Sequence, residues 1–157
     1  MPRERLRIPA YVAALTTAVV VVAIDEASTA WARRVLARHA VHVLGPLWLR
    51  LQFNSGVSFS THPAGPLVLT VVTSVVALAM LIGALRARRG APAYGFGLMF
   101  GGGAANVVDR LVASSHRVTD FIAVGSFPVF NEADVAVTVG CVVLIVVALR
   151  GGTLMRR

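Results

Sequence analysis

The sequence predicts an all-α membrane protein with four transmembrane helices, and three observations lead to this class. Its 157 residues have a mean hydropathy of +0.77, with 57% hydrophobic and only 14% charged residues, which is more apolar than soluble domains of this size. Four apolar runs approach the length of about 20 residues that a bilayer requires. All fifteen basic residues are arginines in short groups at the edges of these runs, so the net charge of +8 indicates membrane topology rather than nucleic-acid binding.

The first span is predicted at about residues 8–30, after an arginine-rich start. A cleavable signal peptide ending near residues 30–32 is the alternative for this run. The run is closer in length to a bilayer span, and three further spans follow it, so we interpret it as a transmembrane helix. Asp25 and Glu26 lie near its far end.

The segment 31–64 is mixed in composition and is expected to lie mostly outside the membrane. Within it, residues 48–54 alternate, with Leu49, Leu51 and Phe53 on one face and Trp48, Arg50, Gln52 and Asn54 on the other. This alternation predicts a half-buried strand. The strand would deliver Asn54 and Gly56 to a turn, and residues 57–59 could form a second short strand.

The remaining spans are predicted at residues 66–85, 94–111 and 130–149. The third span is rich in small residues, and its Gly97 and Gly101 have the four-residue spacing that permits close helix packing. Residues 118–124 (VTDFIAV), in the connection before the last span, are predicted to form a short strand. The whole chain, 1–157, is expected to be a single integral membrane domain.

The arginine distribution predicts the orientation. Nine arginines lie in the N-terminal tail, the 86–89 loop and the C-terminus, and six lie on the other side. Both termini are therefore expected in the cytoplasm. The segments 31–64 and 113–130 would share the extracytoplasmic side with the carboxylate-bearing ends of three spans.

The stretch 106–134 holds four of the seven acidic residues of the chain, between strongly apolar segments. Carboxylates are costly near a membrane, so such a cluster is a candidate functional site. The side chains expected to converge there are Asn106, Asp109, Arg110, Asp120, Asn131, Asp134 and, from the first loop, Asn54. Residues three and four apart on a helix share a face. Asn106, Asp109 and Arg110 should therefore lie on one face of their helix, and Asn131 and Asp134 on one face of theirs.

Two aspartates in a poorly solvated site tend to share one proton, and such a pair suits hydrolysis of a peptide bond. Asp120 and Asp134 are the candidates for this pair. For Asp109 we expect mainly a structural role, paired with Arg110, which could instead contact a substrate carbonyl. Asp25 is also expected to support the site, with Arg33 as a possible ion-pair partner.

Other chemistries fit less well. The absence of lysine excludes serine–lysine and Schiff-base mechanisms. A metalloprotease would have to use His39 and His42, but no His-Glu-x-x-His pattern is present. A serine protease could start from Ser58, but no histidine lies within a span to act as its base. An ion-translocating bundle using the same carboxylates stays open as an alternative.

Five sequence blocks together resemble the lipoprotein signal peptidases (signal peptidase II), the intramembrane aspartyl proteases of bacteria. The blocks are an aspartate closing the first span (Asp25), N-x-G with a following aromatic (Asn54, Gly56, Phe59), G-G-x-x-x-N-x-x-D-R (Gly101 to Arg110), V-x-D-F (Val118 to Phe121) and F-N-x-A-D (Phe130 to Asp134). The resemblance implies a four-helix membrane fold with a small extracytoplasmic β-cradle. It also implies removal of the signal peptide from diacylglyceryl-modified prolipoproteins, just before the lipidated cysteine.

The resemblance assigns roles to individual residues. Asp120 and Asp134 match the catalytic pair, whereas Asp25, Asn54, Asn106, Arg110 and Asn131 match positions that support the site or contact substrate; Gly56 and Asp109 belong to the same blocks. No cofactor or metal ion is expected. The implied partners are the prolipoprotein substrates and membrane phospholipid, and the implied location is the bacterial cytoplasmic membrane, with the site near its extracytoplasmic face.

The chain departs from the family pattern at three positions. Thr29 stands where the first block usually has lysine, Glu26 replaces a usual glutamine, and Ala105 stands where a glycine commonly precedes the asparagine. A threonine hydroxyl cannot supply the lysine's charge. These departures leave a second hypothesis, a non-catalytic or divergent paralogue that binds lipidated membrane segments.

Overall fold

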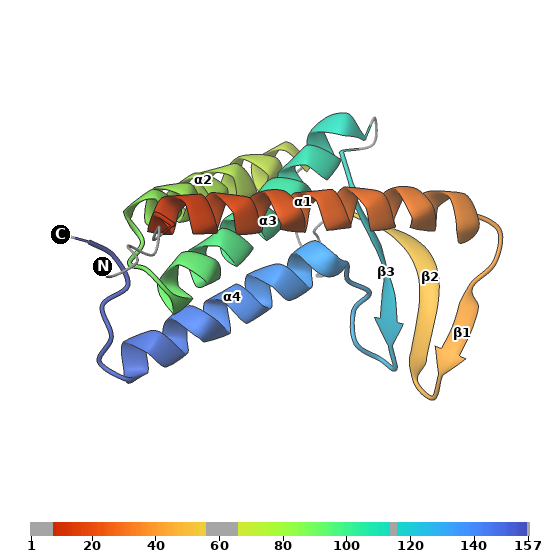
Figure 1. Cartoon of the computed structure of the whole chain (residues 1–157). Helices are drawn as coiled ribbons and strands as arrows, with labels where there is room; N and C mark the ends of the chain where they lie inside the picture. Colours follow the sequence, from red (N-terminus) through yellow and green to blue (C-terminus); the bar gives the residue numbers. More distant parts are fainter. Residues whose placement is uncertain (1–7, 56–65, 114–115, 157) are drawn as a thin grey trace, which may run out of the picture.

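The computed structural model describes residues 8–55, 66–113 and 116–156, and within these ranges the chain is mostly helical with a small antiparallel sheet (Figure 1). The helices are α1 (Ala10–Val35), α2 (Pro66–Arg86), α3 (Ala91–Val112) and α4 (Glu132–Leu149), and the strands are β1 (Val41–Leu44), β2 (Leu47–Asn54) and β3 (Val118–Val124). The sheet lies at one end of the helical bundle, and the two ends of the chain lie at the other.

Three of the helices in the described ranges, α1, α2 and α4, are long and apolar enough to cross a membrane. The helix α3 is 22 residues long, but its glycines and the polar residues near its end make it less apolar. The sequence predicted four spans, so the described residues bear out three of them as candidates. The helix α1 also continues five residues beyond the end expected at residue 30 and brings its last turn against the sheet.

The helix α3 packs against α1, α2 and α4 and so forms the centre of the bundle. Its small residues allow this close approach. A Cβ atom at Gly97 would lie 2.5 Å from the carbonyl oxygen of Ala14, and one at Gly101 would lie 2.8 Å from the Cα of Ala18. The two glycines therefore make a close helix contact, as their spacing predicted, and the structure shows that the partner is α1.

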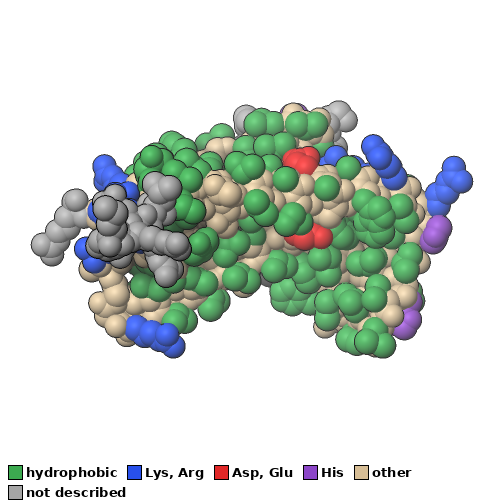
Figure 2. Space-filling view, viewed as in Figure 1, with side chains coloured by type: hydrophobic (Ala, Val, Ile, Leu, Met, Phe, Trp, Pro, Cys, Tyr) green, Lys and Arg blue, Asp and Glu red, His purple; other side chains and the backbone are tan. Residues whose placement is uncertain are grey.

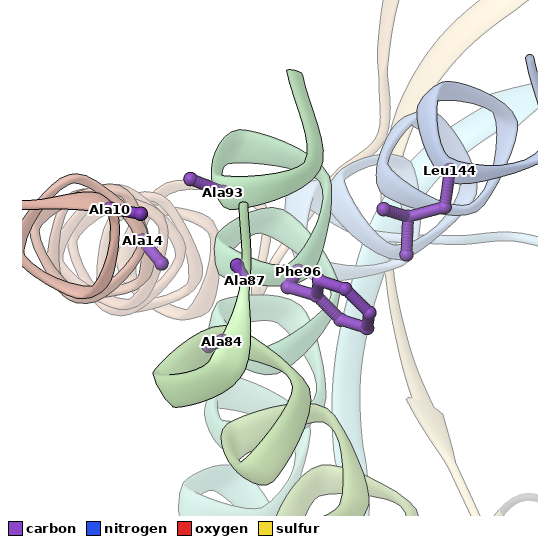
Figure 3. Packing of buried hydrophobic residues seen from close by; sticks show 7 residues of the cluster. All are labelled: Ala10, Ala14, Ala84, Ala87, Ala93, Phe96 and Leu144. Atoms are coloured by element: carbon purple, nitrogen blue, oxygen red, sulfur yellow. The ribbon is translucent and has the colours of Figure 1, made fainter. Parts of the chain in front are cut away.

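The apolar core at the end near the termini is built mainly from alanines, with one large ring between them (Figure 3). It comprises Ala10, Ala14, Ala84, Ala87, Ala93, Phe96 and Leu144. The ring of Phe96 fills the space that the missing side chain of Gly83 leaves open. Small residues on three helices let the axes approach, and this fixes the bundle on which the polar end is built.

The sheet has the strand order β1-β2-β3, and β2 and β3 fall where strands were predicted from the sequence. The strand β1 was not predicted, because its four exposed residues show no alternation. The second short strand expected at residues 57–59 lies outside the described residues. An aromatic contact between Trp31 and Phe121, with ring centroids 6.2 Å apart, joins the end of α1 to β3.

The predicted faces of β2 are only partly right, because the strand contains a bulge. Leu49 pairs with Ile122, whereas Gln52 pairs with Asp120, so β2 holds one extra residue between these pairs. Leu49 and Leu51 both pack against the buried cluster at the end of α1, as predicted, and Gln52 is exposed. Phe53, expected beside Leu49, is instead 49% exposed. The extra residue precedes Asn54, which donates a side-chain hydrogen bond to Asp120.

Candidate active site

The polar residues buried in the described part of the chain gather where the bundle meets the sheet. They are Asp25, Thr29, Asp109, Arg110, Thr119, Asp120 and Asn131. On the face in Figure 2, acidic side chains lie midway along the molecule, between the apolar bundle surface and the sheet, whereas basic side chains lie toward the two ends. Burying polar groups in this way is costly unless they are hydrogen-bonded, so their partners decide what the cluster can do.

Asp120 lies on β3 and is fully buried. Its Oδ2 accepts a hydrogen bond of 2.8 Å from the Nδ2 of Asn54, while its Oδ1 has no hydrogen-bond partner in the described chain. Burial raises the pKa of Asp120 to about 7; the Asn54 bond opposes this rise, and the nearby charge of Asp134 adds to it. Asp120 can therefore hold a proton near neutral pH.

Asp134 lies in the first turn of α4, half-buried, and forms a capping box with Asn131. The backbone N–H of Asp134 donates to Asn131 Oδ1 at 3.0 Å, and the backbone N–H of Asn131 donates to Asp134 Oδ2 at 3.4 Å. The Nδ2 of Asn106 also donates to Asp134 Oδ1, at 3.1 Å. Two N–H donors and the helix N-terminus are the surroundings that suit an ionised carboxylate.

Asn131 connects the two aspartates through one side chain. Its Nδ2 lies 3.3 Å from the carbonyl oxygen of Thr119, the residue before Asp120, and 3.3 Å from Asn106 Oδ1. The same side chain caps the helix that begins with Asp134. The structure therefore brings together Asn54, Asn106, Asp120, Asn131 and Asp134, as the sequence predicted.

Two ion-pair expectations were wrong. Arg33 does not pair with Asp25 but with Asp109, at 2.7 Å between its NH2 and Asp109 Oδ1. Arg110 does not form an ion pair with Asp109 either. Its NH1 donates to the backbone oxygen of Asn106 on its own helix. Asp25 instead accepts a 3.0 Å hydrogen bond from the backbone N–H of Ala133 in the first turn of α4.

The structure also bears on the other residues expected near the site and on two features that were not expected. Gly56, expected to support the site, lies outside the described residues. Thr29 is fully buried and donates its hydroxyl to the backbone oxygen of Asp25, so it stays within its own helix. Two features of the site were not predicted from the sequence, namely the contacts of Thr119 and a 2.9 Å hydrogen bond from Ser28 to Glu132. The V-x-D-F block placed a residue at 119 but gave no sign of its contacts.

Two apolar grooves meet at Asp134. The first, of about 480 Å³, is lined by the β3–α4 connection and α4, including Phe127 and Val139, and its polar members are Asn54, Asp134 and Thr138. The second, of about 350 Å³, lies between α2, α3 and α4, and its lining includes Asn106 and Asp134. An apolar molecule in either groove would reach Asp134.

The arrangement is suited to acid–base chemistry on an apolar substrate. A carboxyl that carries a proton near neutral pH and a carboxylate surrounded by N–H donors are the two partners that such chemistry requires. Among the residues described, no group of three or more histidine, cysteine, aspartate or glutamate side chains is placed to bind a metal ion.

Comparisons with known proteins agree on one family. The family model described as signal peptidase (SPase) II matches residues 17–150. A lipoprotein signal peptidase from Mycobacterium leprae is 31% identical over 96% of this chain and 76% of its own length. One from Mycolicibacterium smegmatis is 34% identical over 96% of this chain and 64% of its own length. One from Chlorobium luteolum is 38% identical over 59% of this chain and 62% of its own length. The chain thus spans less than two thirds of the latter two relatives.

Two solved structures, both described as bacterial membrane enzymes, share the fold. They superpose with TM-scores of 0.73 and 0.72, each covering 87% of this chain, and they cover 87% and 92% of their own chains. Both are 22% identical in sequence, so the likeness concerns the fold alone.

Proposed function

The chain belongs to the signal peptidase II family, and we propose that it is an aspartic endopeptidase that removes the signal peptide from diacylglyceryl-modified prolipoproteins, cleaving before the lipidated cysteine. The observation that carries this proposal is the placement of Asp120 and Asp134. They come from separate elements to one polar end, each held by an asparagine side chain. The relatives are lipoprotein signal peptidases by name, and the substrate is inferred from them.

The proposed reaction uses the two aspartates in different protonation states. Asp134, ionised among N–H donors, takes a proton from a water molecule, whose oxygen attacks the scissile carbonyl carbon. Asp120, protonated, donates a hydrogen bond to the carbonyl oxygen and stabilises the charge that develops there. The C–N bond then breaks as the pair delivers a proton to the leaving amine, and one proton remains shared between the two carboxyls.

The two grooves support a substrate with two apolar parts. A lipidated precursor has a hydrophobic signal segment on one side of the scissile bond and acyl chains on the other. Because both grooves open at Asp134, each apolar part can occupy one groove while the bond between them lies at the carboxyls. Asn54 and Asn106, which line these grooves, are placed to orient the substrate backbone as well as the aspartates.

We also propose that α3 is a fourth span, which would make residues 1–157 a single integral membrane domain. Its 22 residues give a length of about 33 Å, which matches a hydrocarbon core of about 30 Å. Its position at the bundle centre explains its lower hydropathy, because it faces other helices rather than lipid. With four spans, the arginine distribution supports a topology that has both termini in the cytoplasm and the site near the extracytoplasmic face, among phospholipid headgroups.

The decisive experiment is cleavage of a purified diacylglyceryl-modified precursor by the protein in nanodiscs. Wild type should cleave, and Asp120→Asn and Asp134→Asn should each lose activity by about three orders of magnitude or more. Glu132→Gln is the matched control, because its amide oxygen can still accept the Ser28 hydrogen bond, and it should retain activity. Full activity in either aspartate variant would remove that residue from its role. Binding of the precursor by wild type without cleavage would favour the non-catalytic alternative.

A further inference from the structure

Arg33, Asp109 and Thr119 form a closed ring of hydrogen bonds between α1, α3 and β3. Arg33 NH2 contacts Asp109 Oδ1 at 2.7 Å, and Arg33 Nε donates to Thr119 Oγ1 at 2.8 Å. The backbone N–H of Thr119 closes the ring by donating to Asp109 Oδ2 at 2.8 Å. The side chain of Asp109 is 2% exposed and that of Arg33 is 34% exposed, so the ring lies at the edge of the buried cluster.

Thr119 is the point at which this ring meets the candidate active site. Its side-chain hydroxyl and backbone N–H are held by the ring, while its carbonyl oxygen accepts from Asn131. Three contacts from three different elements therefore fix the residue that directly precedes Asp120. A strand residue held in this way leaves its neighbour little freedom to move along or away from the strand.

We propose that Arg33 and Thr119 are positioning residues that hold Asp120 in register with Asp134, with Asp109 as the buried anion joining them. This inference rests on the proposed function, since it assigns Asp120 a reacting role. At this end of α1, Arg33 supplies the cation that pairs with Asp109, whereas the hydroxyl of Thr29 donates within its own helix. Arginine is suited to this position because two separate nitrogens of its rigid planar guanidinium contact the carboxylate and the hydroxyl, whereas a lysine has a single nitrogen on a flexible stem.

The kinetic test uses two substitutions that remove the same bond from opposite ends. Arg33→Lys keeps the charge beside Asp109 but drops the donor to Thr119, and Thr119→Val removes the acceptor while keeping the β-branched shape and both backbone contacts. Each should lower kcat for the lipidated precursor about 10-fold or more with little change in KM, because a small displacement of a reacting group is costly. Thr119→Ser should retain wild-type kcat.

The double variant adds a sharper test. Because both substitutions break one contact, Arg33→Lys/Thr119→Val should be no slower than the worse single variant. Arg34→Lys and Thr17→Val are the matched controls, since Arg34 is exposed and Thr17 bonds within α1 far from the ring. Wild-type kcat in Thr119→Val, or multiplied losses in the double variant, would overturn the inference.

A second readout keeps the inference separate from the proposed function. The carboxyl of Asp120 can be titrated by NMR in protein labelled with [13Cγ]aspartate, with its signal assigned from Asp120→Asn. Among the described residues, the charged groups facing Asp120 are Asp134 on α4 and Asp109 and Arg110 on α3, and none is changed in Thr119→Val.

In Thr119→Val and Arg33→Lys the pKa of Asp120 should therefore fall toward the ordinary aspartate range, because the strand loosens and water reaches the carboxyl. In Thr119→Ser the pKa should be unchanged. Wild-type protein that does not cleave would refute the proposed function, and the titration would still decide the positioning. Identical titrations in all variants would refute the positioning even if cleavage were normal.

Discussion

The buried carboxyl of Asp120 should lower the stability of the protein as pH rises, and replacing it by asparagine should remove this effect. Folding raises the pKa of this group from its ordinary 3.8 to about 7, chiefly through burial. Between these two values the unfolded chain has released the proton and the folded chain still holds it. The stability linked to this proton is therefore fully present below about pH 4 and is lost as pH rises through 7.

The size of the effect follows from the shift. A difference of about three pKa units at about 1.4 kcal/mol each gives about 4 kcal/mol in all, of which about 2 kcal/mol falls between pH 5 and 7. Asp120→Asn has nearly the same shape, and its Oδ1 can still accept from Asn54. Relative to wild type, the variant should thus gain about 2 kcal/mol over this range, of the order of 5 °C in Tm.

The assay is thermal unfolding of wild type and Asp120→Asn in the same nanodiscs, at half-unit steps from pH 4.5 to 8.5. Other titrating groups are common to both proteins, so to first order they cancel in the difference between the two Tm values. That difference should widen from pH 5 to about 8 and then stay constant. A constant difference across the whole range would show that Asp120 titrates normally, and the assignment of the proton to this residue would fail.

Three further outcomes are expected. The kcat of the wild-type protein should fall above about pH 7, as Asp120 loses the proton that polarises the carbonyl, and a pH–rate profile that is flat to pH 9 would contradict this. Asn54→Ala should reduce kcat about 10-fold and shift the high-pH fall of the pH–rate profile to higher pH, because the Asn54 hydrogen bond lowers the pKa of Asp120. A shift of this fall to lower pH in a stopped-time cleavage assay would contradict the prediction. Gly97→Val should lower Tm by several degrees, because its side chain would meet the backbone of Ala14. Gly103→Ala should have a much smaller effect in the same unfolding experiment, because its Cβ would first meet the side chain of Ala77, at 3.3 Å.

The parts of the site that could be predicted from sequence are those set by local spacing. Asn131 and Asp134 are three apart at the start of a helix, which is the spacing of a capping box, and the structure shows that box. The alternation in residues 48–54 likewise predicted β2, and the segment 118–124 was predicted as the strand that forms β3. The convergence of Asn54, Asn106 and the two aspartates was predicted from the number and direction of the spans that hydropathy and arginine counts lead us to expect.

The errors came from contacts that local spacing does not determine. Asp109 and Arg110 are adjacent in sequence, but neighbouring residues on a helix point in different directions, so the pairing predicted for them does not form. The cation for Asp109 arrives from another helix, through an extension of α1 past its predicted end. The bulge in β2 depends on its register with β3, and no pattern within β2 alone indicates it.

Two aspartates that look alike in the sequence are separated in role by the donors around them. Both oxygens of Asp109 accept hydrogen bonds, one from a guanidinium and one from a backbone N–H, so this carboxylate is suited to remain ionised as a structural anchor. Asp120 is equally buried, but its partner in the described chain is a neutral amide and its second oxygen accepts nothing there. A carboxyl in such surroundings keeps its proton more readily and leaves one oxygen available for chemistry. The arginine that α1 contributes to Asp109 thus stabilises the anchor without placing a cation on the reacting group, and this separation lets one small cluster combine a fixed ion pair with a mobile proton.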